Sequence, residues 1–334
     1  MKLGPLEINT DKILAPMMDI TDPPFQALVQ SYGGVGMVVV PMVFINQIEA
    51  APKTVIPFLE DAEKRRPSGV QIVGSGRDKG VIQKAIEILN MFDFDAVDIN
   101  AGCPARRTCS SGGGCSLIQD LSDERLKTMI EVSIKHSNKP VTVKTRLGWE
   151  NADQFLEIAK FIEDAGAEVL TIHGRTRAQG YGDQVDYEKI AQIKQALSIP
   201  VVGNGDIVDF STYQAMKDTG VDAVMIGRAV KRNPEIFGML EKTTAPDQWE
   251  TYVPTLSKVR EYITFLSEYV DQAHRFWNNP RYKTSLLRRT SIWFIKGIPN
   301  YKPIRLRISR MDSYKEIYSF IMGDEIEKII DERS

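Results

Sequence analysis

The stretch PVVGNGDIVDFSTYQAMKDTGVDAVMIGRAV, at 200–230, contains a complete strand–helix–strand unit. The apolar run Pro200–Gly203 predicts a strand, and Ser211–Thr219 has the amphipathic pattern of a helix. Gly220 is placed to end that helix, and Ala223–Ile226 predicts the next strand. Because the helix carries the chain back to the same edge of the sheet, we expect the two strands to run parallel.

The same unit recurs along the preceding 200 residues or so of the chain. Further strands are predicted at Ile13–Met17, Gly36–Val40, Val70–Val73, Ala96–Asn100, Val141–Arg146 and Val169–His173. Further helices are predicted at Asp78–Phe92, Ser122–His136, Ala152–Ala165 and Asp186–Leu197. Eight strands that alternate with helices indicate an α/β fold, and the length favours a (β/α)8 TIM barrel. An open doubly wound sheet is the alternative, because periodicity does not separate the two.

Charge divides the chain in two. Residues 1–244 carry 27 Lys and Arg against 32 Asp and Glu, whereas residues 245–334 carry 15 against 12. From Arg275 to Arg310 there are ten Lys and Arg and no Asp or Glu, with aromatic residues in between. A basic stretch with aromatics is expected of a nucleic-acid interface. The alternative is a solvated helical face whose aromatics pack inward.

Composition excludes several classes of protein. The chain has 334 residues, of which 43% are hydrophobic and 26% charged, with a net charge of -2, so it is neither disordered nor a polycation. The apolar run Val35–Ile45 is too short to span a bilayer, and the first residues lack the apolar core of a secretory signal. Three cysteines are too few for a disulfide framework, so we expect a reducing, cytoplasmic location.

The predicted strands end in polar residues and glycines, and in a barrel these ends share the face that carries the chemistry. Gly203, Gly205 and Gly227 let backbone N–H groups approach a ligand, and Arg228 adds a fixed positive charge. Loops after the last two strands of barrels commonly bind phosphate. We therefore predict a phosphorylated ligand, and both flavin mononucleotide (FMN) and a sugar phosphate fit this pattern.

A glycine-rich segment at 74–80, GSGRDKG, follows a strand and precedes a helix. Its glycines are spaced G-x-G-x-x-x-G rather than G-x-G-x-x-G, and no acidic residue ends a second strand at the expected distance. We do not expect it to bind a dinucleotide.

Cys103 is the candidate reactive residue, because it follows a strand end in a loop that also carries Arg106 and Arg107. The alternative is a small hydrophobe in a loop. Cys103, Cys109 and Cys115 are spaced six apart with no nearby histidine, unlike the paired cysteines of common metal sites, so no metal is expected.

Eight motifs, in order over almost the whole of residues 1–244, resemble the tRNA-dihydrouridine synthases, most closely the bacterial and archaeal members. They are APM at 15–17, TDPPF at 21–25, VQIVGS at 70–75, DINAGCP at 98–104, VKTRLGW at 143–149, IHGRT at 172–176, GNGDI at 203–207 and MIGRA at 225–229. The resemblance implies an FMN-binding (β/α)8 barrel over 1–244 and a small helical tRNA-binding domain over 245–334. It also implies NADPH as the electron donor and tRNA as the partner; no protein partner is predicted.

The resemblance assigns roles to the matched residues. Cys103 would be the general acid that protonates C5 of the target uracil, and Asn100 would contact the base. The residues around the flavin would be Ala15, Pro16, Met17, Gln71, Lys144 and His173. The ribityl and phosphate end would meet Asn204, Gly205, Asp206, Gly227 and Arg228. Arg146 and Arg175 would meet flavin or tRNA, and Arg288 and Arg289 are the candidate tRNA contacts of the basic stretch.

The expected reaction fits these residue types. Reducing the 5,6 double bond of uracil needs a hydride at C6 and a proton at C5, and a cofactor must carry the hydride. A thiol is mostly protonated at neutral pH and can give the proton. Lys144 would stabilise negative charge on the reduced flavin. The target base must first leave the tRNA stack.

Two features depart from the family pattern. The loop ARRTCSSGGGCSLIQD at 105–120 has two extra cysteines, and its three glycines suit a mobile substrate loop. The second strand is expected to end at Pro41-Met42, where many relatives carry an acidic residue. The rival functions are an FMN barrel enzyme that acts on a small molecule and a non-catalytic tRNA-binding module.

Overall fold

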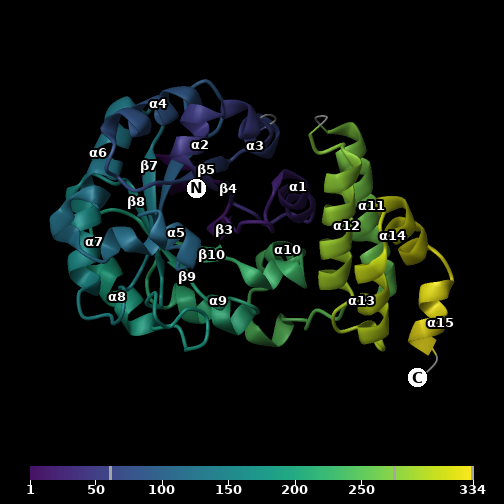
Figure 1. Ribbon diagram of the computed structural model, residues 1–334. Helices are drawn as coiled ribbons and strands as arrows, with labels where there is room; N and C mark the ends of the chain where they lie inside the picture. The colour runs from purple at the N-terminus through teal and green to yellow at the C-terminus, as the bar shows by residue number, and fades with distance from the viewer. Residues whose placement is uncertain (60–61, 274–275, 332–334) are drawn as a thin grey trace.

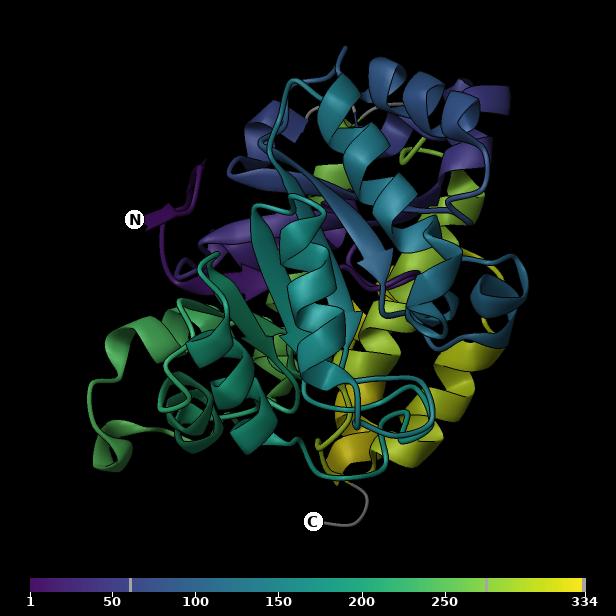
Figure 2. The same cartoon turned by 90° about the vertical axis from the view of Figure 1, so that its left-hand side faces the viewer.

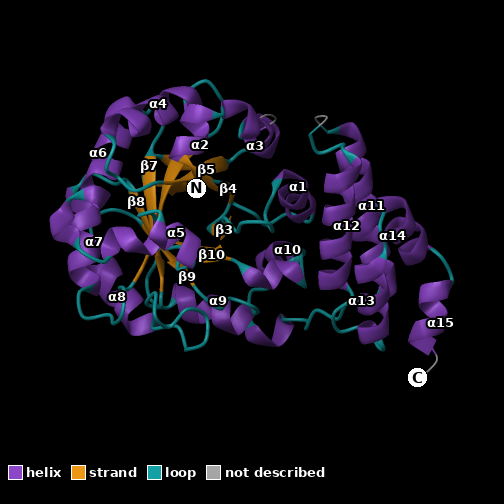
Figure 3. Ribbon diagram, in the orientation of Figure 1, coloured by secondary structure: helices purple, strands orange, loops and turns teal. Residues whose placement is uncertain are grey.

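The computed structural model describes residues 1–59, 62–273 and 276–331. A strand-containing part and a group of helices lie side by side, with the helices α11 and α12 facing the strands across α1 and α10 (Figure 1). Most of the strands gather inside a ring of helices (Figure 3). The first part is built from the N-terminal 242 residues and the second from residues after 255.

Eight parallel strands close into a barrel in the order β10-β3-β4-β5-β6-β7-β8-β9, which confirms the predicted fold class. The strands are β3 Lys12–Leu14, β4 Met37–Phe44, β5 Ser68–Val73, β6 Ala96–Ala101, β7 Val141–Arg146, β8 Val169–His173, β9 Val201–Asn204 and β10 Ala223–Ile226. The barrel strands are buried at every position except Met42 and Phe44 on β4 and Lys144 on β7, as parallel strands covered by helices must be.

A short antiparallel pair that the sequence did not predict precedes the barrel. Strands β1 Lys2–Leu3 and β2 Leu6–Glu7 bury Leu3 and Leu6 against apolar side chains from the first residues of the barrel strands. The turn residue Gly4 has φ +59°, and a Cβ there would lie 3.2 Å from the carbonyl oxygen of Glu168. The pair therefore closes the amino-terminal end of the barrel and leaves the other end open.

Helices surround the barrel, and Figure 2 shows several of them in front of the strands. They are α1 Pro23–Ser31, α2 Ile45–Ala50, α3 Ile56–Leu59, α4 Lys79–Leu89, α5 Arg106–Ser110, α6 Arg125–His136, α7 Phe155–Asp164, α8 Tyr187–Ala196, α9 Phe210–Lys217 and α10 Ile236–Lys242. Asp78 caps α4 by accepting hydrogen bonds from the N–H groups of Gly80 and Val81. Asp209 and Thr212 form a capping box on α9. The segment 74–80 thus leads from β5 into the start of α4.

Two strand ends, those of β4 and β3, differ from the prediction by three residues or more. Strand β4 continues through Pro41 to Phe44, with a register shift against β5 between Val40 and Val43. A bulge of this kind lets a proline lie inside a strand, so the expected end at Pro41 is wrong. Strand β3 ends earlier, at Leu14, because the Thr21 hydroxyl accepts from the Met17 N–H at 2.8 Å and turns the chain away.

The C-terminal helices are α11 Leu256–Gln272, α12 Pro280–Phe294, α13 Tyr301–Arg310, α14 Tyr314–Met322 and α15 Glu325–Asp331. The expected boundary at 244/245 falls in the connection between α10 and α11. The aromatic side chains Trp277 and Phe294 are buried, and the Trp277 indole donates to the carbonyl of Pro57 in the barrel part at 3.1 Å. These aromatics therefore pack inward. Arg275, the first residue of the basic stretch, lies outside the described residues.

Among the helices in the described part of the chain, none combines the length and the apolar character needed to cross a bilayer.

Candidate functional site

The open end of the barrel gathers polar side chains from neighbouring strand ends. Lys144 on β7 donates a hydrogen bond from Nζ to Oδ1 of Asn204 on β9, at 2.9 Å. The amide nitrogen of Asn204 in turn donates to the carbonyl of Met225 on β10, at 2.7 Å. Burial and the nearby charge of Arg146 lower the pKa of Lys144 to about 8. Lys144 therefore carries a positive charge at neutral pH in a site that is largely shielded from water.

His173, at the end of β8, is a neutral imidazole. Burial lowers its pKa strongly, and the positive charges of Lys144, Arg146, Arg175 and Arg228 lower it further. Its Nε2 lies 3.4 Å from the Arg175 guanidinium, which only donates hydrogen bonds, so Nε2 accepts and the ring proton lies on Nδ1. Nδ1 is thus available as a hydrogen-bond donor.

Arg175 and Arg228 share the carboxylate of Asp206. Arg175 pairs with one oxygen, and Arg228 donates to the other at 2.6 Å. Burial raises the pKa of Asp206, but the hydrogen bond and charge of Arg175 and the charge of Arg228 outweigh it and leave the pKa below its usual value. Arg228 remains exposed, and the adjacent Gly205 has φ +134°. This end of the site has positive charge in excess.

Ala15, Pro16, Met17 and Gly227 lie at neighbouring positions on the rim. A Cβ placed on Gly227 would lie 3.6 Å from the Met17 sulfur and 3.7 Å from the Ala15 Cβ. The structure therefore brings together the loops after β3 and β10, which the sequence places more than 200 residues apart.

Cys103 lies in the loop after β6 and is partly exposed. Its backbone N–H donates to Oδ1 of Asn100 at 2.8 Å, and its Sγ lies 3.5 Å from the Thr108 hydroxyl. Asn100 also donates to Oε1 of Gln71 on β5, at 2.7 Å. The structure thus links three of the predicted site residues: Gln71, Asn100 and Cys103.

The two extra cysteines lie in the same loop. Cys109 directs its Sγ toward the carbonyl of Cys103 at 3.4 Å, and Cys115 is buried, which raises its pKa to about 12. All three are free thiols. In the part of the chain that the structure describes, no three His, Cys, Asp or Glu side chains gather as a metal site would require.

The glycines of this loop have a packing function. A Cβ on Gly114, which has φ +59°, would lie 2.6 Å from the carbonyl oxygen of Cys103. The loop forms α5 and a 3-10 turn at Gly114–Ile118. These glycines let the chain pass close behind Cys103, and the prediction that they suit a mobile loop is not tested by this packing.

Arg146 and Arg175 are bound within the protein. Arg146 donates to the carbonyls of Gly102, Thr176 and Gly180 at 2.9–3.0 Å and so braces the loop that carries Cys103 against the loop after β8. Arg175 is only 1% exposed and also donates to the backbone of that second loop.

Arg288 and Arg289 bind partners within the protein. Arg288 donates to the carbonyl of Met311 within the helical part. Arg289 pairs with Asp22, the residue that caps α1, and the Tyr282 hydroxyl donates to the same carboxylate at 2.6 Å. These internal partners disfavour both arginines as tRNA contacts, which a binding measurement must test.

Sequence reasoning missed Tyr181. Its ring lies 4.4 Å from the Arg228 guanidinium and 5.3 Å from that of Arg146, and 55% of the residue is exposed. The signal was a lone aromatic residue between Gly180 and Gly182 in a loop beside the site. Stacking of this kind holds an aromatic ring at the rim.

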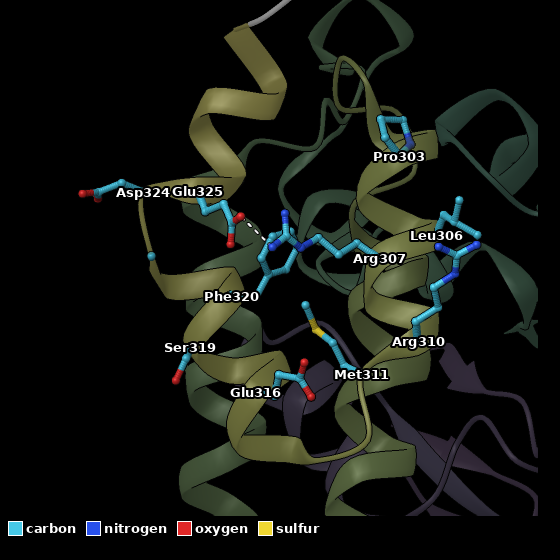
Figure 4. Close-up of a pocket in the computed structure, with 11 residues that line it drawn as sticks. Pro303, Leu306, Arg307, Arg310, Met311, Glu316, Ser319, Phe320, Asp324 and Glu325 are labelled. Atoms are coloured by element: carbon cyan, nitrogen blue, oxygen red, sulfur yellow. Dashed lines mark ion pairs between the residues drawn. The ribbon is translucent and has the colours of Figure 1, made fainter.

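A separate pocket of about 780 Å³ lies between α13 and α14 and the start of α15 (Figure 4). Arg307, Arg310, Glu316, Phe320 and Glu325 are among its lining residues, and Arg307 pairs with Glu325 across it at 2.6 Å. Its charges are mixed, and it lies within the C-terminal helices. It is not part of the site at the barrel mouth.

This chain is similar to known proteins over nearly its whole length. The family model described as dihydrouridine synthase (Dus) matches residues 13–328. The "tRNA-dihydrouridine synthase B" of Pseudomonas aeruginosa is 32% identical over 93% of this chain and 91% of its own. The "probable tRNA-dihydrouridine synthase 1" of Synechocystis sp. is 31% identical over 95% of this chain and 86% of its own.

Among solved structures, an old yellow enzyme homologue from Zymomonas mobilis matches with a TM-score of 0.52 at 16% identity, over 76% of this chain and 96% of its own. A histamine dehydrogenase from Rhizobium sp. matches with a TM-score of 0.54 at 13% identity, over 72% of this chain and 47% of its own. These two likenesses concern the fold alone. The family model and the curated relatives, which span nearly the whole chain, show that this chain belongs to the dihydrouridine synthase family.

Proposed function

We propose that the protein reduces specific uridines of tRNA to dihydrouridine, with FMN in the barrel mouth and NADPH as the reductant. The observation that carries the proposal is that Cys103 lies at the same open end as Lys144, His173 and the Arg175–Asp206–Arg228 group. A proton donor and a cationic ligand site therefore face one space. Because the proposed substrate is tRNA, we also propose that the enzyme acts in the cytoplasm.

The residues at the mouth fit a phosphorylated flavin. Four cationic side chains lie close enough to His173 to lower its pKa. Asp206, a carboxylate beside them, is already paired with two arginines. Such an excess of positive charge suits an anionic ligand. Asp206 and Arg228 stand at the exposed end. Gly227 lacks a Cβ there, and Gly205 holds a backbone conformation, φ +134°, that favours glycine. A sugar phosphate would fill only this end.

We assign the flavin contacts as follows. Arg228 and the backbone at Gly205 and Gly227 would bind the phosphate, with Asn204 and Asp206 beside the ribityl chain. The remaining contacts, around the ring, would come from Ala15, Pro16, Met17, Gln71, Lys144 and His173. When bound, the flavin supplies the hydride that reduces the uracil ring at C6.

The chain's own residues supply the rest of the reaction. Asn100 orients the base, and Cys103 gives its thiol proton to C5 as C6 is reduced, so that two hydrogens are added across the double bond and the thiolate is later reprotonated from water. The ammonium of Lys144 stabilises negative charge in a site where burial makes such an interaction stronger than in water.

For tRNA, we propose a surface that includes exposed cations of α13. Lys302, Arg305 and Arg310 are exposed on this helix, and none of the three forms an ion pair among those the structure records. Positive side chains that face water are the ones that can replace the counterions of a phosphate backbone. Contacts there would offset the cost of flipping the target base out of the stack, which is about a few kcal/mol in such enzymes.

The direct test uses purified protein loaded with FMN, NADPH and a tRNA transcript that contains no modified bases. We expect nucleoside mass spectrometry to find dihydrouridine at defined positions. Flavin reduction by NADPH without any product in tRNA would favour the small-molecule oxidoreductase instead. Binding of tRNA by a preparation that takes up no FMN would favour the non-catalytic module.

A further inference from the structure

A chain of hydrogen bonds crosses the barrel interior and ends at the backbone of Cys103. The Thr142 hydroxyl donates to Oδ1 of Asp98 at 2.6 Å, and the Gln71 amide nitrogen donates to Oδ2 of Asp98 at 2.7 Å. The Asn100 amide nitrogen donates to Oε1 of Gln71 at 2.7 Å. Finally, Oδ1 of Asn100 accepts from the Cys103 N–H at 2.8 Å and from the Gly102 N–H at 3.1 Å.

Asp98 determines which group donates and which accepts in each of these hydrogen bonds. A carboxylate only accepts hydrogen bonds, so the Gln71 side chain must turn its NH2 group toward Asp98 and its oxygen toward Asn100. Asn100 must then turn its own NH2 group toward Gln71. Its oxygen is left facing the loop, where the N–H groups of Gly102 and Cys103 require an acceptor. Both amides thus have one orientation that satisfies every group.

The surroundings make the orientation costly to reverse. All three side chains are buried: Asp98 is 5% exposed, Gln71 1% and Asn100 8%. Water therefore cannot easily replace a lost hydrogen-bond partner. Burial raises the pKa of Asp98, while the hydrogen bonds from Thr142 and Gln71 and the charge of Lys144 lower it, with a net rise. If the amide of Gln71 or Asn100 were flipped, two donors would face each other or a buried polar group would have no partner. Such an unpaired buried group costs about 1–3 kcal/mol.

We propose that Asp98 is a positioning residue: through Gln71 it fixes the orientation of Asn100, and through Asn100 it holds the loop that places the Cys103 thiol. The inference rests on the proposed function only in taking that thiol as the proton donor to C5. The side chain of Asp98 accepts hydrogen bonds from Gln71 and Thr142 and has no recorded hydrogen bond with Cys103. Its effect on the reaction passes through the two amides.

The test compares three variants of the FMN-loaded full chain, each also carrying Cys109→Ser and Cys115→Ser so that iodoacetamide reports on Cys103 alone. Asp98→Leu removes the acceptor. Asp98→Asn keeps it, because the new side chain can face Gln71 with its oxygen and the Thr142 hydroxyl with its nitrogen. Val97→Ala is the matched control, since Val97 is a fully buried neighbour on β6 outside the chain of hydrogen bonds.

We expect Asp98→Leu to speed alkylation of Cys103 about fivefold. With the flavin reduced beforehand, so that any change in flavin reduction through Gln71 does not enter, it should slow single-turnover formation of dihydrouridine by at least about tenfold. Asp98→Asn should stay within about threefold of the parent in both measurements, and Val97→Ala should lower the melting temperature without moving either. If Asp98→Leu does not fold, Asp98→Ala, which leaves room for a water molecule, takes its place with the same expected changes.

Parent-like alkylation and turnover in Asp98→Leu would overturn the proposal. So would equal losses in Asp98→Asn, which would assign the effect to charge, or equal changes in Val97→Ala, which would assign it to general destabilisation. If the parent makes no dihydrouridine but alkylation follows the expected order, the positioning role stands and the proposed function fails.

Discussion

Lys144 and Asn204 share a 2.9 Å hydrogen bond that passes over strand β8, where His173 ends the strand. The contact holds one buried ammonium at the centre of the barrel mouth. Because burial lowers the pKa of Lys144 to about 8, this charge is present at pH 7 and is lost as the pH rises through 8. In the unfolded chain, the same group keeps its proton up to a pKa of about 10.4.

Two pH effects follow for Lys144. FMN affinity should fall by roughly tenfold, about 1.4 kcal/mol, between pH 7 and 9.5, and in Lys144→Met the affinity should be lower at pH 7 and flat with pH. Stability should rise with pH in the window from about 8 to 10.4, because there the unfolded chain binds a proton that the folded one does not. Flavin fluorescence titrations and urea unfolding measure the two effects. A parent affinity as flat as that of Lys144→Met would contradict the role of the ammonium.

Gly205 should not tolerate a side chain. Its φ is +134°, and a Cβ would lie 2.7 Å from Val185 and 3.1 Å from the His173 ring. Gly205→Ala should cost about 2–3 kcal/mol of stability and weaken FMN binding. Gly220→Ala is the control: it also has a positive φ, +83°, but nothing within 3.9 Å, so about 1 kcal/mol and no change in FMN affinity are expected. Equal losses in both variants would show that the space beside His173 is unimportant.

Asp22 and Arg289 join the two parts of the molecule by a largely buried ion pair. Removing one partner leaves the other charge without its counterpart, so Arg289→Gln should destabilise the protein by about 2–4 kcal/mol in urea unfolding. Asp22→Asn, which retains an acceptor for Tyr282 and for the first turn of α1, should cost less. We expect Arg289→Gln to leave the salt dependence of tRNA binding almost unchanged. A decrease of a full unit in the slope of log K for tRNA binding against log salt concentration would show that Arg289 contacts tRNA.

The exposed arginines of α13 should behave in the opposite way. Arg305→Gln with Arg310→Gln should weaken tRNA binding and reduce the slope of log K against log salt by about 1–2, with stability within about 0.5 kcal/mol of the parent. Filter binding at several salt concentrations measures the slope. An unchanged slope would place the tRNA surface elsewhere on the molecule.

The barrel could be predicted because its strands are buried on both faces and read as short apolar runs. All eight were found, and the errors came from local chemistry: Pro41 lies in a bulge, and the Thr21 hydroxyl ends β3 early. Strands β1 and β2, of two residues each, carry too little pattern to be recognised.

The site could be predicted in part, from the polar residues at strand ends. What the sequence could not show was which side chains meet. Asp98 is an acid inside a buried strand, and its link to Cys103 runs through residues on two strands. Arg289 lies 267 positions from Asp22. Charge alone could not separate an arginine that faces water from one that holds two parts of the fold together.

The central claim is that Cys103 is the proton donor to a uracil reduced at the barrel mouth. The most direct measurement is a single turnover in the absence of oxygen: protein with pre-reduced FMN is mixed with unmodified tRNA, and both flavin oxidation and dihydrouridine are followed. Cys103→Ala should bind FMN and tRNA normally but form product at least about a hundredfold more slowly, whereas Cys109→Ala, six residues along the same loop, should match the parent. Parent-like product formation by Cys103→Ala would contradict the account.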